Sequence, residues 1–287
     1  MSRILVIGRT GQVARALAEV VPGATFLGRE ALDLAEPGAA GPAIAATAPE
    51  VVINAAAYTA VDRAEGEPDL ARRVNAEAVG EIAEASARAG ARLIHISTDY
   101  VYPGSGTRAH VESDPTEPVN TYGATKLAGE AAAREANPRT VILRTSWVYA
   151  PWGHNFVRTM LRLAERERLT IVADQFGQPT SALHIARACA AVAGNAGAPA
   201  GVYHVAGAGV TSWAGFAREI FRGALARGLI STAPEIVDIP TADYPTPARR
   251  PLNSRLDCTR FAETFGLAPR PWTEALAKTL DRLAEAR

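Results

Sequence analysis

Three residues in the middle of the chain have the side chains that reduction of a carbonyl group requires. Thr98 closes the apolar run 93–96, and Tyr122 and Lys126 follow four positions apart. On a helix this spacing places both side chains on one face. An ammonium group beside a phenol is expected to lower the pKa of the phenol from about 10. Such a tyrosine can donate a proton to a substrate oxygen while Thr98 hydrogen-bonds the same oxygen. We therefore predict Thr98, Tyr122 and Lys126 as catalytic residues that need a hydride donor.

A glycine-rich turn near the start of the chain predicts the site of that donor. The apolar run 3–7 leads into Gly8 and Gly11, and apolar residues then recur at helical spacing. Gly8 permits a tight turn, and Gly11 lets the backbone approach a pyrophosphate at the helix N-terminus. We assign Gly8, Arg9, Thr10 and Gly11 to cofactor contact; the alternative is an ordinary turn between a strand and a helix.

The end of the second predicted strand, 24–27, favours a phosphorylated cofactor. An Asp or Glu at this point holds the ribose 2′-hydroxyl of NAD, whereas an Arg suits the 2′-phosphate of NADP. The chain has Arg29 followed by Glu30, and Arg9 in the turn can assist. The interpretation is NADPH, with NADH left open by Glu30 and with solvent-exposed arginines as the alternative.

Strands and helices alternate through the first half of the chain. Buried-type strands are predicted at 51–53, 92–97 and 140–143, with helices at 39–47 and 69–89 between them. This pattern predicts an α/β fold with a Rossmann-like, doubly wound parallel sheet. The small residues Ala55 and Ala56 at a strand end leave room for the cofactor. We expect residues 1–145 to form mainly the cofactor domain, and residues 146–287 mainly a smaller substrate lobe interleaved with returning segments.

The second half supplies candidates for substrate binding. Trp147 follows a strand end and can stack on a sugar. Gln175 lies in the polar stretch 174–180, predicted to be a loop, and a helix is predicted from 154 to about 168. Arg249 and Arg250 lie in a proline-rich loop and suit a diphosphate. A core aromatic, a connecting turn and a solvated turn are the respective structural alternatives.

Composition excludes several other classes of protein. The 287 residues contain 30 Lys plus Arg and 30 Asp plus Glu, so the net charge gives no support for a nucleic-acid or membrane partner. Two separated cysteines argue against a disulfide framework. No apolar run approaches the roughly 20 residues of a membrane span. These features predict a cytoplasmic globular protein.

The motifs together resemble a known family along almost the whole chain. The sequence is similar to the extended short-chain dehydrogenase/reductases and, within them, to the dTDP-4-dehydrorhamnose reductases. The resemblance rests on GRTGQVA (8–14), INAAAYTAVDRAE (53–65), STDYVYPG (97–104), YGATKLAGE (122–130), RTSWVYAPWGHNF (144–156), DQFGQPT (174–180) and YPTPARRPLNSRLD (244–257).

The resemblance implies NAD(P)H-dependent reduction of the 4-keto group of dTDP-4-dehydro-β-L-rhamnose to dTDP-L-rhamnose, the last step in dTDP-rhamnose biosynthesis, by a monomer or homodimer. It places the catalytic Thr, Tyr and Lys on Thr98, Tyr122 and Lys126. Further cofactor contacts are expected at Gln12, Val13, Asp33, Leu34, Ala57, Tyr58, Thr59, Tyr122 and Lys126. Lys126 is expected to hold the cofactor's ribose. Further substrate contacts are expected at Asp99, Tyr100, Asn155 and Asn253.

One departure from the family concerns a metal. Some members use an acidic residue on the first helix for Mg²⁺-mediated dimerisation, but here the stretch 14–17 reads Ala-Arg-Ala-Leu. No metal site is therefore predicted.

Two other functions stay open at this point. The first is a related 4-ketoreductase that makes another deoxysugar. The second is a non-catalytic NADP-binding regulatory subunit, which loss of the Tyr or the Lys would favour. A dehydratase is expected to carry an acidic pair beside Thr98, where only Asp99 is present.

Overall fold

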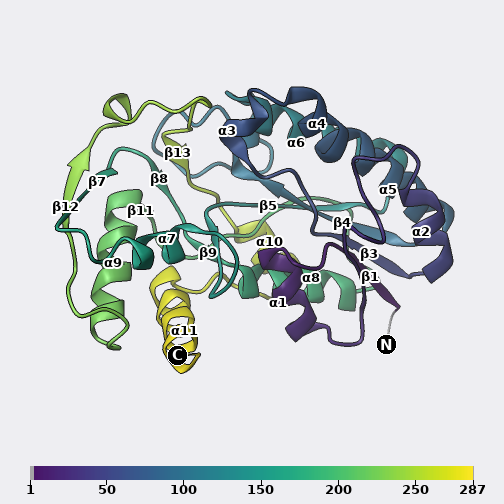
Figure 1. Cartoon of the computed structure of the whole chain (residues 1–287). Coiled ribbons are helices and arrows are strands. Elements are labelled where there is room, and N and C mark those ends of the chain that lie inside the picture. Colours follow the sequence, from purple (N-terminus) through teal and green to yellow (C-terminus); the bar gives the residue numbers. More distant parts are fainter. Residues whose placement is uncertain (1–2, 287) are drawn as a thin grey trace.

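The computed structural model describes residues 3–286 and is built on a six-stranded parallel sheet (Figure 1). The spatial order of the strands is β10-β5-β4-β3-β1-β2. Their bounds are β1 (Ile4–Ile7), β2 (Thr25–Leu27), β3 (Val51–Asn54), β4 (Arg92–Thr98), β5 (Val141–Thr145) and β10 (Gly201–His204). The order reverses direction at β1, which confirms the predicted doubly wound α/β fold.

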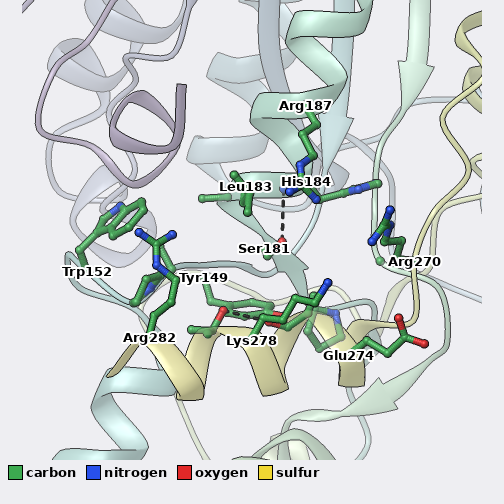
Figure 2. A pocket seen from close by; sticks show the side chains of 17 residues that line it. Tyr149, Trp152, Ser181, Leu183, His184, Arg187, Arg270, Glu274, Lys278 and Arg282 are labelled. Carbon is green, nitrogen blue, oxygen red and sulfur yellow. Dashed lines mark hydrogen bonds between the residues drawn. The ribbon is translucent and has the colours of Figure 1, made fainter. Parts of the chain in front are cut away.

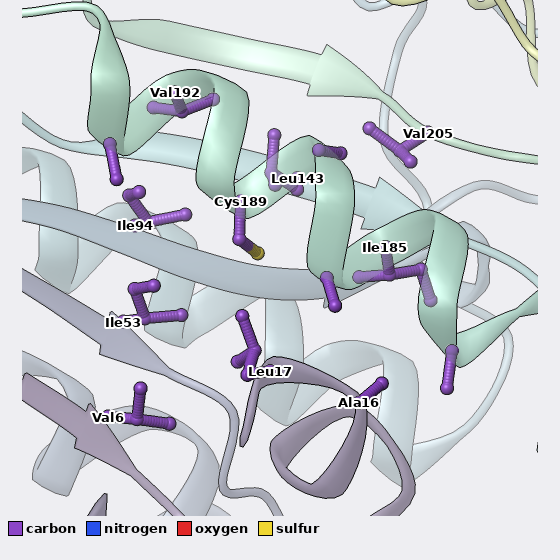
Figure 3. Packing of buried hydrophobic residues seen from close by; sticks show 14 of the residues in the cluster. Val6, Ala16, Leu17, Ile53, Ile94, Leu143, Ile185, Cys189, Val192 and Val205 are labelled. Carbon is purple, nitrogen blue, oxygen red and sulfur yellow. The ribbon is translucent and has the colours of Figure 1, made fainter. Parts of the chain in front are cut away.

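Alternation along each strand gives the sheet two apolar faces. Val6, Ile53 and Ile94 pair in one row across β1, β3 and β4. This row packs against α1 (Gln12–Val20) and α8 (Ala182–Gly194) through side chains that include Leu17 and Cys189 (Figure 3). Burial of each such aliphatic side chain stabilises the fold by about 1.5–3 kcal/mol.

The adjacent positions on the same strands face the opposite layer of helices. Leu5, Val52 and Leu93 pack against α2 (Ala40–Thr47), α5 (Ala78–Arg88) and α6 (Thr121–Ala136). Ile44 and Ile82 are fully buried in this layer. The sheet therefore has helices on both faces, and α6 carries two of the predicted catalytic residues.

The helix predicted over 69–89 is interrupted by a wide turn. It consists of α4 (Pro68–Arg72), the π-helix η1 (Arg73–Glu77) and α5, with the short α3 (Val61–Ala64) before it. A π turn is rare and often lies at a functional site. Here it contains the fully buried Asn75.

A second group of elements surrounds a separate apolar cluster. The strands β7 (Arg168–Val172) and β12 (Glu235–Ile239) pair in parallel. They pack with α7 (Phe156–Arg162), α9 (Trp213–Leu225) and α11 (Trp272–Glu285). The helix predicted from 154 to about 168 spans only Phe156–Arg162; residues 163–167 form turns and bends, and Arg168 already belongs to the strand ladder with Glu235.

Short strands connect the second group to the large sheet. β6 (Val148–Tyr149) pairs with β9 (Thr180–Ser181), and β8 (Phe176–Gly177) lies between β11 (Thr211–Ser212) and β13 (Asn253–Ser254). The stretch 174–180 was predicted to be a loop, but its backbone joins these ladders on both sides. The remaining elements are η2 (Asp99–Val101), η3 (Thr241–Asp243) and α10 (Thr259–Phe265). None of the helices within residues 3–286 is both long and apolar enough to cross a membrane.

Candidate active site

The start of α6 fixes the position of Tyr122 and Lys126. Asn120 caps the helix by accepting a hydrogen bond from Gly123 N at 2.8 Å. A Cβ at Gly123 would lie 2.2 Å from the carbonyl oxygen of Tyr100, so only glycine lets the helix approach η2 this closely. The rings of Tyr100 and Tyr122 meet edge to face with centroids 5.6 Å apart. The helix thus brings Tyr122 to the carboxyl end of β4.

Thr98 meets Tyr122 at this point. Its hydroxyl donates to Asp99 Oδ1 at 3.2 Å and accepts from Tyr100 N at 3.2 Å. Burial raises the pKa of Tyr122 to about 12, although hydrogen bonding with the Thr98 side chain opposes the rise. The Tyr122 phenol therefore carries its proton at neutral pH.

The expectation that Lys126 lowers the pKa of Tyr122 is wrong for this arrangement. Lys126 Nζ donates to the carbonyl oxygen of Ile96 at 2.8 Å and lies 3.2 Å from His95 Nε2. Burial of the phenol then decides the direction of its pKa. Burial also lowers the pKa of Lys126 to about 8, with the Glu130 carboxylate acting in the opposite direction.

A buried ion pair lies one helical turn beyond Lys126. Glu130 accepts two hydrogen bonds from Arg144 on β5, at 2.9 and 2.6 Å, and one from Ser97 on β4 at 2.5 Å. Arg144 also donates to the Tyr102 hydroxyl at 2.6 Å. Both members of the pair are almost fully buried, so this network fixes α6 against the strands that end at the site.

Several buried polar atoms near this edge of the sheet have no partner within residues 3–286. They are Asp99 Oδ2, Thr145 Oγ1 and Arg250 Nη1. Thr145 pairs with Thr98 in the β4–β5 ladder, so its hydroxyl lies beside the catalytic strand end. Burial raises the pKa of Asp99 to about 7, opposed by the side chains of Ser254 and Thr98. Orphaned buried donors and acceptors indicate a place where a polar ligand would complete the hydrogen bonding.

The glycine-rich turn fits a pyrophosphate. Gly8 has φ +112° at the end of β1, a conformation that L side chains rarely adopt. Gly11 begins α1 without a side-chain cap, and no protein atom lies within 4 Å of the position its Cβ would take. The first N–H groups of α1 are therefore free to bind an anion. Thr10 is exposed at the turn, and Gln12 and Val13 are partly buried on its helix side.

The two arginines predicted to read the cofactor are exposed beside this turn. Arg9 pairs with Glu30 at 3.2 Å, and Arg29 pairs with Asp33 at 3.0 Å. The Asp33 carboxylate also accepts from Ala35 N at 2.9 Å, and the next residue, Leu34, is buried. Exposed pairs of this kind are worth roughly 0–1 kcal/mol, so either arginine can exchange its partner for a phosphate at little cost.

A side chain that the sequence analysis did not assign holds the loop 55–59. Asn75 accepts from Tyr58 N at 2.8 Å, and it donates to Tyr58 O at 3.0 Å and to Thr125 Oγ1 at 3.2 Å. It therefore links the predicted cofactor wall to α6. The Tyr58 hydroxyl donates to Glu67, while Ala55, Ala56 and Ala57 are partly buried and Thr59 is exposed. The only sequence signal was a polar residue on the apolar side of a helix.

Trp147 has a strained backbone next to the site. Its φ of +47° is unusual for a bulky residue and marks a position that the surroundings impose. The indole stacks on Trp213 at 3.7 Å between centroids and leaves no space for a side chain at Gly177. Gln175 accepts from Trp213 Nε1 at 3.1 Å and donates to Thr241 at 3.2 Å. The polar atoms of Gln175 are thus used to hold the indole pair.

The late arginine loop lies against the start of α6. Asn120 donates to Arg249 O at 2.8 Å, and Arg250 Nη2 donates to Asp62 at 2.7 Å. The Arg249 guanidinium is exposed and has no hydrogen bond or ion pair within the described residues 3–286. Arg250 Nη1 is buried without a partner. The loop therefore presents donors suited to a diphosphate, and Asp62 was not foreseen as its anchor.

Two predicted substrate contacts have all their polar atoms occupied by protein. Asn155 caps α7 and donates to Gln12 Oε1 at 2.8 Å. Asn253 donates to Arg108 O at 2.8 Å and accepts from Arg255. The structure places the first beside the glycine-rich turn and the second beneath the loop 103–120, so both are arranged to support the site.

A cavity of about 60 Å³ lies outside this catalytic group, between α8 and α11 (Figure 2). Its lining includes Trp152, His184, Arg187, Arg270 and Lys278, and none of the predicted catalytic residues. Trp152 connects it to the turn by donating to Gln12 O at 3.1 Å. Across residues 3–286 no group of three or more His, Cys, Asp or Glu side chains is arranged to hold a metal ion.

Comparison with known proteins agrees with this geometry. The family model described as the RmlD substrate binding domain matches residues 1–285. The dTDP-4-dehydrorhamnose reductase of Escherichia coli (strain K12) is 43% identical over 295 residues, covering 98% of this chain and 97% of that protein. The chain belongs to the dTDP-4-dehydrorhamnose reductase family. The family expected from the sequence motifs is thereby confirmed.

Other members of the family match over a similar length. The dTDP-4-dehydrorhamnose reductase of Burkholderia thailandensis (strain E264) is 47% identical and covers 96% of each chain. The structure of dTDP-4-dehydrorhamnose reductase from Bacillus anthracis in complex with NADP superimposes with a TM-score of 0.91 at 33% identity, covering 98% of this chain and 99% of that one. The family fold therefore extends over both groups of elements described above.

Proposed function

We propose that the chain catalyses NADPH-dependent reduction of the C4 keto group of dTDP-4-dehydro-β-L-rhamnose to dTDP-L-rhamnose. The observation that carries this proposal is the interaction of Tyr122 with Thr98 at the carboxyl end of β4, with Lys126 one turn further along the same helix. Family membership and the NADP complex of the Bacillus anthracis relative support it. The division into a cofactor domain, mainly 1–145, and an interleaved substrate lobe, mainly 146–287, belongs to the same proposal.

The protonated phenol of Tyr122 suits a reductase. NADPH, when bound, supplies the hydride that reaches C4. The oxygen of the former carbonyl then needs a proton, and a phenol with a pKa of about 12 holds one ready at neutral pH. Thr98 orients the oxygen with its hydroxyl. Lys126, on the same face of α6, would hold the cofactor's ribose. Its amine faces Ile96 O and His95, so it would favour the phenolate only as an ammonium group that has left these partners.

Cofactor recognition is assigned to residues around the first βα turn. Gly8, Gly11 and the N-terminus of α1 would hold the pyrophosphate, and Arg9 and Arg29 would hold the 2′-phosphate. NADPH is therefore the proposed donor, although Glu30 leaves NADH possible. Asn75 links the loop 55–59 to α6 and would hold this part of the cofactor wall in place.

Sugar-nucleotide binding is assigned to residues whose polar atoms are still unpaired. Asp99, Thr145 and Arg250 would hydrogen-bond the sugar and diphosphate, and the exposed Arg249 would add a second cation. Trp147, with Tyr100 near Tyr122, would form the apolar wall. Three further residues would hold the pocket residues in place through hydrogen bonds to protein groups: Gln175, Asn155 and Asn253.

The test is coupled oxidation of reduced cofactor with the purified full chain. NADPH and NADH are each supplied with dTDP-4-dehydro-β-L-rhamnose, and product stereochemistry is determined by NMR. We expect NADPH oxidation with formation of dTDP-L-rhamnose. Absence of oxidation with both cofactors would contradict the reductase proposal, and an epimeric product would indicate the related 4-ketoreductase.

Assembly and location belong to this proposal as well. A monomer or homodimer is expected, which sedimentation equilibrium checks; a larger assembly would contradict it. The buried free thiols of Cys189 and Cys258 support a reducing compartment, and hence the cytoplasm. Cell fractionation checks that location.

A further inference from the structure

Three buried polar side chains contact one another in sequence from β3 through β4 to α6. Asn54 is at the end of β3, His95 is within β4, and Lys126 is on α6. The first two are 0% exposed and the third is 1% exposed. Asn54 Nδ2 lies 3.2 Å from His95 Nδ1, and His95 Nε2 lies 3.2 Å from Lys126 Nζ. No solvent separates these groups, so each must match the hydrogen-bonding capacity of its neighbour.

The backbone fixes the direction of the first bond. Ala56 N donates to Asn54 Oδ1 at 3.1 Å, which identifies the oxygen of the amide and leaves Nδ2 to face the imidazole. An amide nitrogen only donates, so His95 Nδ1 must accept. A neutral imidazole has one acceptor and one donor nitrogen, and the proton of His95 is therefore on Nε2.

The second bond then has a defined polarity. The His95 Nε2–H group faces Lys126 Nζ, and an ammonium group has no lone pair with which to accept it. Only the neutral amine completes this bond, while it donates to Ile96 O at 2.8 Å. Glu130 on α6 is the charged neighbour that favours the ammonium form, and it is already paired with Arg144 on β5.

We propose that His95, oriented by Asn54, is a positioning residue whose Nε2–H group favours the neutral amine of Lys126 over the ammonium form. This inference rests on the proposed role of Lys126. The lowered pKa values of Lys126 and of His95, both caused first by burial, act in the same direction. The ammonium form of Lys126, which is the form that can stabilise the Tyr122 phenolate, cannot accept the bond from His95. The chain of three residues sets the pH range in which that charged form is available.

The composition of the chain makes a direct measurement practical. Lys126 and Lys278 are the only lysines in the sequence. Lys278 is exposed on α11 and serves as an internal reference. In the unliganded full chain, NMR of ¹³C-labelled lysine follows the titration of each amine, and ¹⁵N-labelled histidine reports the tautomer of His95. We expect the Nε2–H tautomer in the wild type; the Nδ1–H tautomer would overturn the proposal without any variant.

Two substitutions at Asn54 distinguish the effect of the His95 tautomer on the proton affinity of Lys126 from the effect of an added negative charge. Asn54→Asp requires a proton on His95 Nδ1, and Asn54→Leu removes the donor without adding charge. Both should turn Nε2 into an acceptor and raise the proton affinity of Lys126 at least tenfold, with Lys278 unchanged. A rise confined to Asn54→Asp would be a charge effect and would refute the tautomer argument.

The kinetic arm uses the pH profile of NADPH oxidation. In Asn54→Leu the alkaline limb of kcat should move up by at least one pH unit, whereas a merely structural defect would lower kcat at every pH. An unmoved limb in a folded variant would refute the inference. If the wild type does not reduce the sugar at all, the proposed function fails, and the NMR titrations still decide the question of His95.

Discussion

Asp99 gives the sharpest test of the electrostatics of this site. The residue is 3% exposed, and burial raises the pKa of its carboxyl group from 3.8 to about 7. The folded protein therefore binds more protons than the unfolded chain between about pH 4 and pH 7. Stability must fall as the pH rises through that window. Replacing Asp99 by Asn removes the ionisation while keeping the shape of the side chain.

The expected magnitude follows from the size of the shift. Each unit of pKa corresponds to about 1.4 kcal/mol, so a shift of roughly three units gives up to about 4 kcal/mol. Asp99→Asn should therefore raise the free energy of unfolding at pH 8 by up to about 4 kcal/mol. At pH 4, where Asp99 is protonated in the folded state, the gain should nearly vanish. Turnover of the dTDP-sugar should fall at the same time, because the carboxylate is assigned to the sugar.

Urea denaturation at several pH values measures this difference directly. Asp114→Asn is the matched control: hydrogen bonding to Arg108 lowers the pKa of Asp114 to about 2, so loss of its charge should reduce stability at pH 8. The two substitutions remove the same charge and should act in opposite directions. A gain for Asp99→Asn that is equal at pH 4 and pH 8, or a loss at pH 8, would refute the reasoning.

Three further changes test other parts of the site. Tyr122→Phe should lower kcat by about 10²–10⁴-fold with NADPH binding retained, whereas Tyr203→Phe on β10 should not; unchanged turnover in the first would remove Tyr122 as the acid. Arg29→Ala should weaken NADPH binding much more than NADH binding in fluorescence titrations, and equal losses would mean that Arg29 does not read the 2′-phosphate. Glu130→Gln should destabilise the fold by about 3–5 kcal/mol in urea, because it leaves Arg144 buried without its carboxylate; a loss below about 1 kcal/mol, the range of exposed pairs, would mean that the pair is not essential.

Local sequence signals were enough to predict the sheet and to place Tyr122 and Lys126 on one helix. The Gly8–Gly11 turn and the four-residue spacing of Tyr122 and Lys126 depend only on neighbouring residues, and the fold places both as expected. The helix over 154–168 was predicted too long, because pairing of Arg168 with Glu235 overrides local helical preference. Long-range pairing is the part that periodicity does not contain.

Residue types also failed to show which polar atoms were still free. Asn155 and Asn253 lie in the right motifs, yet protein partners occupy their side chains. Asn75 contacts the loop 55–59 and His95 contacts Lys126, but both sit in helix and strand patterns that equally suit core residues. Asp62 and Arg250 are 188 positions apart, so their contact has no local signature. The motifs therefore indicated the region of the proposed site, and the hydrogen-bond network was needed to separate candidate ligand contacts from residues that support them.

The position of β10 at the edge of the large sheet has a consequence for how the protein is made. This strand pairs with β5, but it ends only at His204 of the 287 residues. A ribosome that has released the first five strands therefore leaves the β5 edge without its neighbour while the next segment, including α8, is still being synthesised. Unpaired strand edges are templates for association with other chains. The interval between residues 145 and 201 is therefore the part of synthesis in which the β5 edge is open to association with other chains.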